Sequence, residues 1–257
     1  MESIFLVYSI FVFLFGLIIG SFLNCVIYRI EKGESFVKGR SYCPHCKHTL
    51  RWLDLVPVFS FLLLRGKCRY CHAKISVQYP LIEILTGIVF LLIFAYQFST
   101  VFQVVFLWYI ASVFIIIFVY DLKHYIIPDS VLFPAIGITF FYQLIFHFSI
   151  VFLSYLLSGL GAAAFFLAIF LVTKGRGMGF GDVKLAILLG LLLGFPHIIV
   201  GLFLAFLFGA IIGVILLLRK KKGLKSEVPF APFLIAGTFI ALVWGTQLIH
   251  WYTHIII

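Results

Sequence analysis

K-G-R-G-M-G-F-G-D-V-K, residues Lys174–Lys184, sets four alternating glycines before a single acid, Asp182. An apolar run starts directly at Val183, so the acid stands at the mouth of a predicted membrane helix. A charged side chain at membrane depth costs about 3 kcal/mol or more, and such residues usually pair or do chemistry. The glycine spacing fits neither a dinucleotide-binding turn nor a phosphate loop. Two interpretations stay open: Asp182 caps the helix that follows, or it has a chemical role.

The composition of the whole chain places this helix in a membrane. Hydrophobic residues make up 64% of the 257 residues and charged residues 11%, far from the composition of soluble proteins. The amino terminus, Met1–Leu6, has no basic segment before the first apolar run. We therefore expect this run to be retained as the first span and not removed as a signal peptide.

Apolar runs predict an all-α, polytopic membrane helix bundle of about eight spans, judged against the roughly 20 residues that a spanning helix needs. The runs are Ile4–Ile27, Pro80–Tyr96, Val101–Tyr120, Ser130–Phe148, Val151–Val172, Val183–Phe195, Ile198–Leu218 and Pro229–Trp251. The sixth is short. The predicted organisation is a first span at residues 1–27, a small cytoplasmic loop domain at residues 28–79 and a membrane core at residues 80–257.

The basic residues predict the orientation. If the amino terminus is outside, the inside segments are Tyr28–Tyr79, Asp121–Asp129, Thr173–Asp182 with Lys184 just beyond it, and Arg219–Val228. Together they hold all 19 Lys and Arg residues of the chain. The positive-inside rule then places these segments in the cytoplasm. Because topology accounts for the net charge of +10, we expect no nucleic-acid partner.

Two acids are predicted to meet at the cytoplasmic face. Asp121 ends the third span and Asp182 starts the sixth, so both lie at the same side of the bilayer. Two neighbouring carboxyl groups in a low dielectric do not both ionise easily, so they share a proton. One can then act as a base toward water and the other as an acid toward a carbonyl, which is the chemistry of aspartic proteases.

Two further acids lie at span ends. Asp129 follows Pro128 and precedes the fourth span, so helix capping is the favoured interpretation and a direct role the alternative. If Asp129 only caps a helix, Asp129→Asn should retain activity. Glu83 follows Pro80 in what we expect to be the first helical turn, where an acid suits the helix dipole or contacts a basic part of a substrate.

The loop at residues 28–79 carries two C-x-x-C pairs, Cys43/Cys46 and Cys68/Cys71. Their spacing is close to that of four-thiolate zinc sites. Disulfides are the alternative, but cytoplasmic thiols stay reduced, which favours zinc. Four thiolates leave no open position, so the predicted role of the zinc is structural.

These pieces together resemble the type IV prepilin peptidase family of membrane aspartic proteases, which carry a G-x-G-D motif. The resemblance rests on Gly20–Asn24 with Tyr28-Arg29, both C-x-x-C pairs, Arg65–Cys68, Tyr79–Glu83, Asp121, Pro128-Asp129 and Gly179–Lys184. It covers nearly the whole chain.

The resemblance implies a bacterial cytoplasmic-membrane enzyme of pilus, secretion or competence systems. It would remove the short basic leader from prepilins or pilin-like proteins at the cytoplasmic face of the lipid bilayer. Asp121 and Asp182 would be the catalytic pair. The residues that would contact the substrate or support the motif of the family are Gly179, Gly181, Lys184, Asp129 and Glu83. The tetracysteine loop implies a second activity, N-methylation of the new amino terminus with S-adenosylmethionine.

A different class of function competes with this one. A zinc-loop membrane scaffold or transporter could use Asp121, Asp182 and Glu83 as a proton or cation path. Such a path needs polar groups in the outer half of the bundle, whereas these acids cluster at the inner face. A membrane-tethered nucleic-acid module is a third possibility, and failure of the isolated loop to bind DNA at low salt would remove it.

Overall fold

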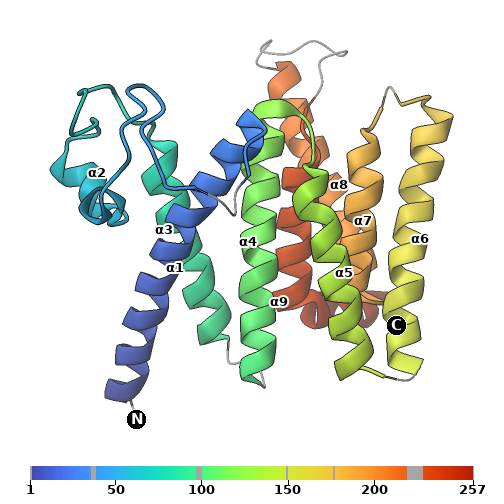
Figure 1. Ribbon diagram of the computed structural model, residues 1–257. Coiled ribbons are helices and arrows are strands. Elements are labelled where there is room, and N and C mark those ends of the chain that lie inside the picture. Colours follow the sequence, from blue (N-terminus) through green and yellow to red (C-terminus); the bar gives the residue numbers. More distant parts are fainter. Residues whose placement is uncertain are drawn as a thin grey trace. The chain divides into compact units, whose positions relative to one another are not determined.

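The computed structural model describes residues 2–35, 39–96, 100–148, 150–175, 177–218 and 228–256. Over these residues the chain is helical apart from its connections (Figure 1). The elements are α1 (Glu2–Lys32), η1 (Trp52–Leu55), α2 (Phe59–Leu63), α3 (Gln78–Ala95), α4 (Val101–His124), α5 (Asp129–Phe146), α6 (Ile150–Val172), α7 (Phe180–Leu193), α8 (His197–Leu218) and α9 (Ala231–Ile256). The chain forms two compact units, residues 1–116 and 117–257, and α4 continues from one into the other.

Unit 1 is built on the close packing of α1 against α3. A Cβ added at Gly16 would lie 2.7 Å from the Cα of Gly87, and one at Gly20 would lie 2.6 Å from the Cα of Glu83. Four residues forward along α1 correspond to four residues back along α3, so the two helices are antiparallel. Small residues let backbones approach in lipid, where packing replaces the hydrophobic effect as the source of helix association.

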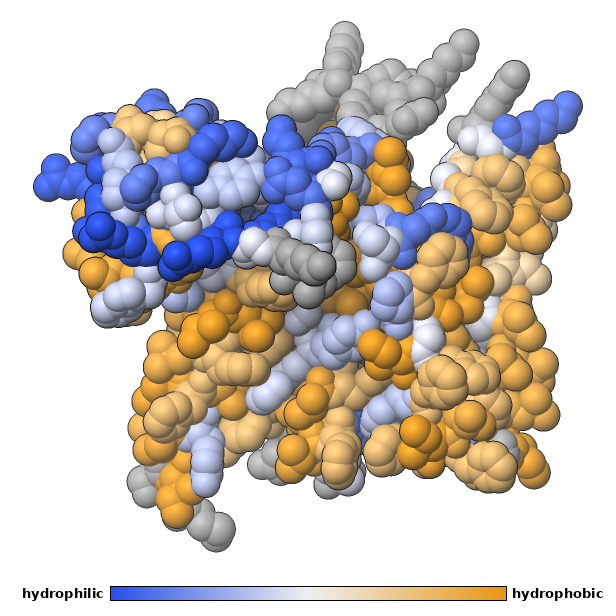
Figure 2. Space-filling view, viewed as in Figure 1, coloured by the Kyte–Doolittle hydropathy of each residue, from blue (hydrophilic) through white to orange (hydrophobic). Residues whose placement is uncertain are grey.

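The polar segment between α1 and α3 folds into two similar turns beside the short helices η1 and α2. Tyr42 pairs with Thr49, and Lys67 with Lys74, in two isolated antiparallel β-bridges. Each C-x-x-C pair therefore lies in a small hairpin-like loop. The visible face of this segment is mostly hydrophilic, with a few apolar patches, while the surface of α1 and α3 is largely hydrophobic (Figure 2). That contrast is expected of two spanning helices that carry a water-exposed domain.

Unit 2 is organised around α7, which packs against α5, α6, α8 and α9. The contact with α6 is the closest, because a Cβ at Gly190 would lie 2.5 Å from the Cα of Gly159. The pair α8 and α9 is antiparallel, since Gly201 meets Gly237 and His197 meets Gly245. Ten of the 14 residues of α7 are buried, so protein surrounds this helix.

The sequence predicts about eight spans, whereas the structure has seven helices of spanning length and one short buried helix within the described residues. Within the described residues, seven helices are long and apolar enough to cross a membrane. The predicted sixth span, α7, has 14 residues, about 21 Å at 1.5 Å per residue, which is shorter than a hydrocarbon core of about 30 Å. Gly194, at φ 64°, ends it. The side-chain amide of Gln143 in α5 donates to the Leu191 carbonyl at 2.8 Å, which satisfies a buried group at this helix end.

The predicted inside segments differ in how far the structure describes them. The segments around Tyr28–Tyr79, Asp121–Asp129 and Thr173–Lys184 are mostly described. The basic cluster from Arg219 to Lys225 lies outside the described residues, as does Arg176.

Candidate active site

Asp121 and Asp182, predicted to meet, do lie together in unit 2. Asp121 is in the last turn of α4 and Asp182 in the first turn of α7. Their exposed fractions are 5% and 7%. The charge of Asp121 acts directly on Asp182. The structure therefore places two carboxyl groups within electrostatic reach of one another in a buried setting.

Each of these carboxylates accepts a hydrogen bond from the start of a helix. The N–H of Ala231, the first residue of α9, donates to Asp121, and the N–H of Gly179 donates to Asp182. Helix N-termini favour negative charge, so both sites can carry a carboxylate away from water. Side-chain patterns in the sequence do not reveal these backbone donors. The only signal for Ala231 is the pair of prolines, Pro229 and Pro232, around a helix start.

Asp182 is not itself the N-cap of α7, but its carboxylate accepts a hydrogen bond from the N-cap residue. Gly179 is the N-cap of α7, and Asp182 is the third helical residue. Its carboxylate bonds back to the cap residue, as an acid at this position does in a capping box. On Asp121, Oδ2 is buried and has no hydrogen-bond partner among the described residues. A buried carboxylate oxygen without a partner is costly, so this atom marks the place where a water or a substrate polar group would bind.

Asp129 is not the cap of α5, which corrects the favoured prediction. Pro128 occupies the N-cap position without a side-chain bond, and Asp129 is the first helical residue. The carboxylate of Asp129 instead accepts Lys184 Nζ, at 2.7 Å to Oδ1 and 2.8 Å to Oδ2. Asp129 and Lys184 thus form an ion pair between α5 and α7.

Gly181 and Gly179 have different surroundings in the turn that carries Asp182. A Cβ at Gly181 would lie 3.2 Å from Cβ of Ile127, so this position is a close contact with the link between α4 and α5. At Gly179 the corresponding atom would lie 3.7 Å from Oδ2 of Asp182, an ordinary contact distance. Gly181 therefore allows the link to pass close to the backbone of this turn, one residue before Asp182.

Glu83 lies in unit 1 and bonds to the loop at residues 28–79. Because α3 begins at Gln78, Glu83 lies in its second turn and not in the first turn as predicted. Its side chain is buried, and Oε2 accepts the N–H of Val58 at 2.7 Å. Val58 has φ 60°, an uncommon value for a branched residue, and it is the N-cap of α2. In this structure Glu83 fastens the loop to α3.

The four predicted metal ligands form one cluster. The sulfur atoms of Cys43, Cys46, Cys68 and Cys71 all lie within 4.8 Å of one another, and those of Cys43 and Cys71 are 3.9 Å apart. Four sulfurs at about 2.3 Å from a central zinc are about 3.8 Å from each other. The donor set and its spacing are consistent with a zinc site.

Backbone geometry prepares this cluster. The N–H of Lys47 donates to the Cys43 carbonyl and that of His72 to the Cys68 carbonyl, at 2.9 and 3.0 Å. Both Lys47 and His72 have positive φ, so the two loops repeat the same turn. Burial alone would raise the pKa of the Cys43 thiol, but backbone N–H groups of Cys46 and His45 and neighbouring thiols lower it to about 7. A thiol that ionises readily suits metal binding.

Asp54 organises the rest of the loop, a role that the sequence analysis did not predict. Its carboxylate accepts Arg69 Nε at 2.7 Å, the Tyr70 hydroxyl at 3.0 Å and the N–H of Arg51 at 3.0 Å. Burial alone would raise the pKa of Asp54, but these donors outweigh it and lower the pKa. The side chain connects η1 to the second C-x-x-C turn.

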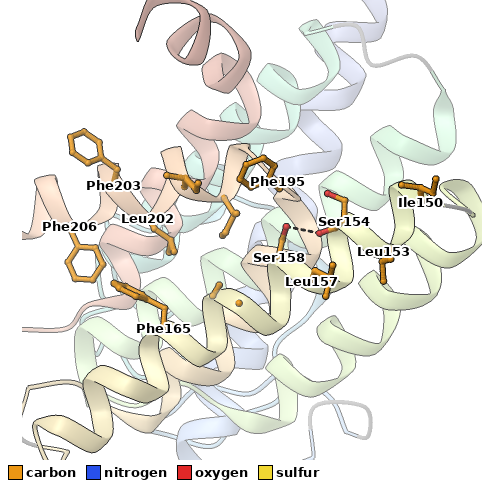
Figure 3. A pocket seen from close by; sticks show the side chains of 14 residues that line it. Ile150, Leu153, Ser154, Leu157, Ser158, Phe165, Phe195, Leu202, Phe203 and Phe206 are labelled. Atoms are coloured by element: carbon orange, nitrogen blue, oxygen red, sulfur yellow. Dashed lines mark hydrogen bonds between the residues drawn. The ribbon is translucent and has the colours of Figure 1, made fainter. Parts of the chain in front are cut away.

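A separate apolar groove lies between α6 and α8. Its volume is about 780 Å³, and Figure 3 shows Leu153, Leu157, Leu202 and Phe203 among the side chains that line it. Its lining includes neither Asp121 nor Asp182. The Ser158 hydroxyl at its wall donates to the Ser154 carbonyl, at 2.7 Å, so that polar group is satisfied within α6. Such a surface suits hydrocarbon and supplies no groups for catalysis.

Comparison with known proteins identifies the class to which this fold and pair of carboxyl groups belong. Residues 14–97 match the Bacterial Peptidase A24 N-terminal domain, and residues 108–214 match the Type IV leader peptidase family. The tetracysteine loop falls in the first match and both aspartates in the second. No solved structure is significantly similar to the chain.

Curated relatives extend the similarity to nearly full length. The chain is 32% identical to a prepilin leader peptidase/N-methyltransferase of Aeromonas hydrophila, over 95% of this chain and 93% of the relative. It is 33% identical to a protein of the same name from Bacillus subtilis, over 93% and 96%, and 32% identical to one from Legionella pneumophila, over 93% and 92%. The chain belongs to the type IV leader peptidase family.

Proposed function

We propose that this chain is a bacterial membrane prepilin leader peptidase/N-methyltransferase and that Asp121 and Asp182 are its catalytic pair. The observation that carries the assignment is the buried meeting of these two carboxylates, each bonded to one backbone N–H. Family membership supplies the reaction class, and this pair supplies groups that can perform it.

The pair can hydrolyse a peptide bond without help from a nucleophilic side chain. In the reactive state one carboxyl is protonated and the other ionised, because two buried charges so close are unfavourable. The ionised carboxylate takes a proton from a water as that water attacks the peptide carbonyl, and the protonated carboxyl donates to the carbonyl oxygen. Oδ2 of Asp121, which has no hydrogen-bond partner in the described part of the chain, is available to bind that water or the carbonyl.

The names of the relatives also include an N-methyltransferase activity, and we propose the same activity for this chain. S-adenosylmethionine would supply the methyl group, and the acceptor would be the amino terminus freed by cleavage. The four cysteines would hold a structural zinc that stabilises the loop at residues 28–79.

The substrates would be prepilins or pilin-like proteins, and the enzyme would act at the cytoplasmic face with its amino terminus outside. The distribution of Lys and Arg supports this orientation. The placement of Asp121 and Asp182 at the ends of their helices fits a site near the membrane surface. Within the described part of unit 2 there is no further acid in α6, α8 or α9, so the structure gives no support to an acidic transport path.

The direct test uses the purified full chain in detergent with a prepilin and S-adenosylmethionine. Mass spectrometry of the product should show a shortened protein, and then the same product heavier by one methyl group. A prepilin that stays intact with correctly folded, zinc-loaded enzyme would contradict the proposal. Cleavage without a mass increase would retain the peptidase and remove the methyltransferase.

A further inference from the structure

The ion pair between Asp129 and Lys184 lies in a symmetrical setting. Lys184 Nζ is 5.4 Å from the ring centre of Phe133 and 5.5 Å from that of Phe180. Phe133 follows Asp129 by one turn of α5, and Phe180 precedes Lys184 by one turn of α7. Each helix thus contributes one charge and one aromatic face to the same contact, and cation–π attraction adds to the ion pair.

This contact lies close to Asp182 in sequence and in space. The chain from Asp121 to Asp129 meets the first five residues of α7 twice, through Ile127 at Gly181 and through Asp129 at Lys184. These points stand one residue before and two residues after Asp182. The same segment is tied to Asp121, whose carbonyl accepts the N–H of Tyr125 at 2.9 Å. The position of one carboxylate relative to the other therefore depends on these two contacts.

We propose that Asp129 and Lys184 are a positioning pair for peptide cleavage: they hold α7 so that Asp182 faces Asp121, and their charges balance beside the two carboxylates. The inference rests on the proposed function of Asp121 and Asp182. Neither member of the pair has to touch the substrate. A displacement of about 1 Å between reacting groups can cost about a hundredfold in rate, so a modest loosening of this contact should be measurable.

The charge balance is a distinctive feature of the pair, because the described residues of unit 2 include few other charges. Within the described part of unit 2 the Asp, Glu, Lys and Arg side chains are Asp121, Lys123, Asp129, Lys174, Asp182 and Lys184, and the histidines are His124, His147, His197, His250 and His254. The helices α6, α8 and α9 contribute no Asp, Glu, Lys or Arg over their described lengths. Removing one member of the pair consequently leaves an unbalanced charge close to Asp182.

The kinetic test compares Asp129→Asn, Lys184→Met and the double variant with wild type on a prepilin substrate. We expect kcat to fall about tenfold in each single variant while KM stays within about twofold. The double variant should be no worse than either single one, because both changes remove the same contact. Lys184→Arg should keep most of the activity, since a guanidinium can bond the carboxylate and stack on the rings.

The pH–rate profile separates positioning from general weakening of the fold. Lys184→Met leaves the Asp129 charge unbalanced and should move the profile to higher pH, whereas Asp129→Asn should move it to lower pH. We expect shifts of about 0.3 to 0.5 pH unit, the size that Coulomb's law gives for a charge about a helical turn away near water. The double variant should return to the wild-type profile while its kcat stays low.

Lys174→Met is the matched control, because Lys174 is an exposed cation of the same unit. It should leave both kcat and the profile unchanged. Wild-type kcat in both single variants, or profiles that shift in the same direction, would overturn the inference. A fall in melting temperature that accounts for all of the lost activity would overturn it too. Asp121→Asn and Asp182→Asn serve as references: if these still cleave, the proposed function fails, whereas if only the pair variants behave as wild type, the positioning role alone fails.

Discussion

At the scale of single residues, the proposed chemistry depends on two carboxyl groups, each of which accepts a hydrogen bond from one backbone N–H at a helix start. Asp121 bonds to the start of α9 and Asp182 to the start of α7, each through one backbone N–H. The equivalence is favourable because either carboxyl can then carry the single negative charge of the pair. In addition, Oδ2 of Asp121 is buried and has no hydrogen-bond partner among the described residues.

Replacing either acid by its amide tests this arrangement. Asp121→Asn and Asp182→Asn should each lower cleavage by at least about a thousandfold, because an amide cannot exchange the shared proton. The shape of the side chain hardly changes, so both variants should remain folded. The measurement is prepilin cleavage by purified enzyme with matched melting temperature and zinc content. Substantial cleavage by either variant would remove the pair from its proposed role.

At the scale of elements, α7 is a short helix that depends on its neighbours at both ends. Its start is held by Ile127 and Asp129, and its last turn by Gln143. Between these ends it is pressed against α6 at Gly159 and Gly190. A helix too short to span the membrane can remain buried because other helices satisfy its terminal groups.

Gly190→Ala should destabilise unit 2 by about 1 to 3 kcal/mol, because the new methyl group would overlap the backbone of α6 and neither backbone can move easily. Gly161→Ala on α6 is the control, since a Cβ there meets nothing within 4 Å. Thermal unfolding in detergent should show a lower midpoint for the first variant alone. Equal midpoints would mean that the two helices are less tightly packed than the structure indicates.

The cysteine loop is the second element whose stability is open to test. Replacing Cys43 and Cys46 by serine should release bound metal and destabilise the loop, because a closed thiolate site contributes folding free energy directly. Metal analysis of the wild-type protein should give one zinc per chain, and limited proteolysis should cut the variant within residues 28–79. A metal-free wild-type protein under reducing conditions, or a disulfide in protein from intact cells, would argue against the zinc site.

At the scale of the whole molecule, the cysteine cluster and the two aspartates fall in different family matches. The tetracysteine loop lies in the match at residues 14–97, and the proposed catalytic pair in the match at residues 108–214. The two compact units follow nearly the same division. Methyl transfer and peptide cleavage are therefore expected to depend on different residues.

Asp182→Asn should fail to cleave a prepilin yet still methylate a supplied pre-cleaved pilin. Methylation needs a neutral amine, so its rate should rise as the pH approaches the value of about 7.7 to 8.0 that is usual for an α-amino group. Cleavage should favour a lower pH, at which one carboxyl of the pair keeps its proton. Mass spectrometry of the amino terminus across this pH range measures both. Loss of methylation in a folded, zinc-loaded Asp182→Asn variant would show that the two sites are not separable.

The sequence by itself determined the membrane class, the ligand cluster and the two carboxylates. Hydrophobic runs predict spans because the bilayer imposes a length, and C-x-x-C spacing predicts a metal site because the ligands of each pair are close in sequence. Asp121 and Asp182 could be paired because the parity of the spans between them puts both at one face. These are properties of local pattern and of topology.

Only the tertiary structure decided which partners the polar groups take. Three such contacts join segments more than 20 residues apart. They are the bond from the Ala231 N–H to Asp121, the bond from the Val58 N–H to Glu83, and the ion pair of Asp129 with Lys184. Sequence patterns describe one helix at a time and give no information about which face meets which neighbour. For the same reason α7 reads as a span, although it is a short helix whose ends other helices satisfy.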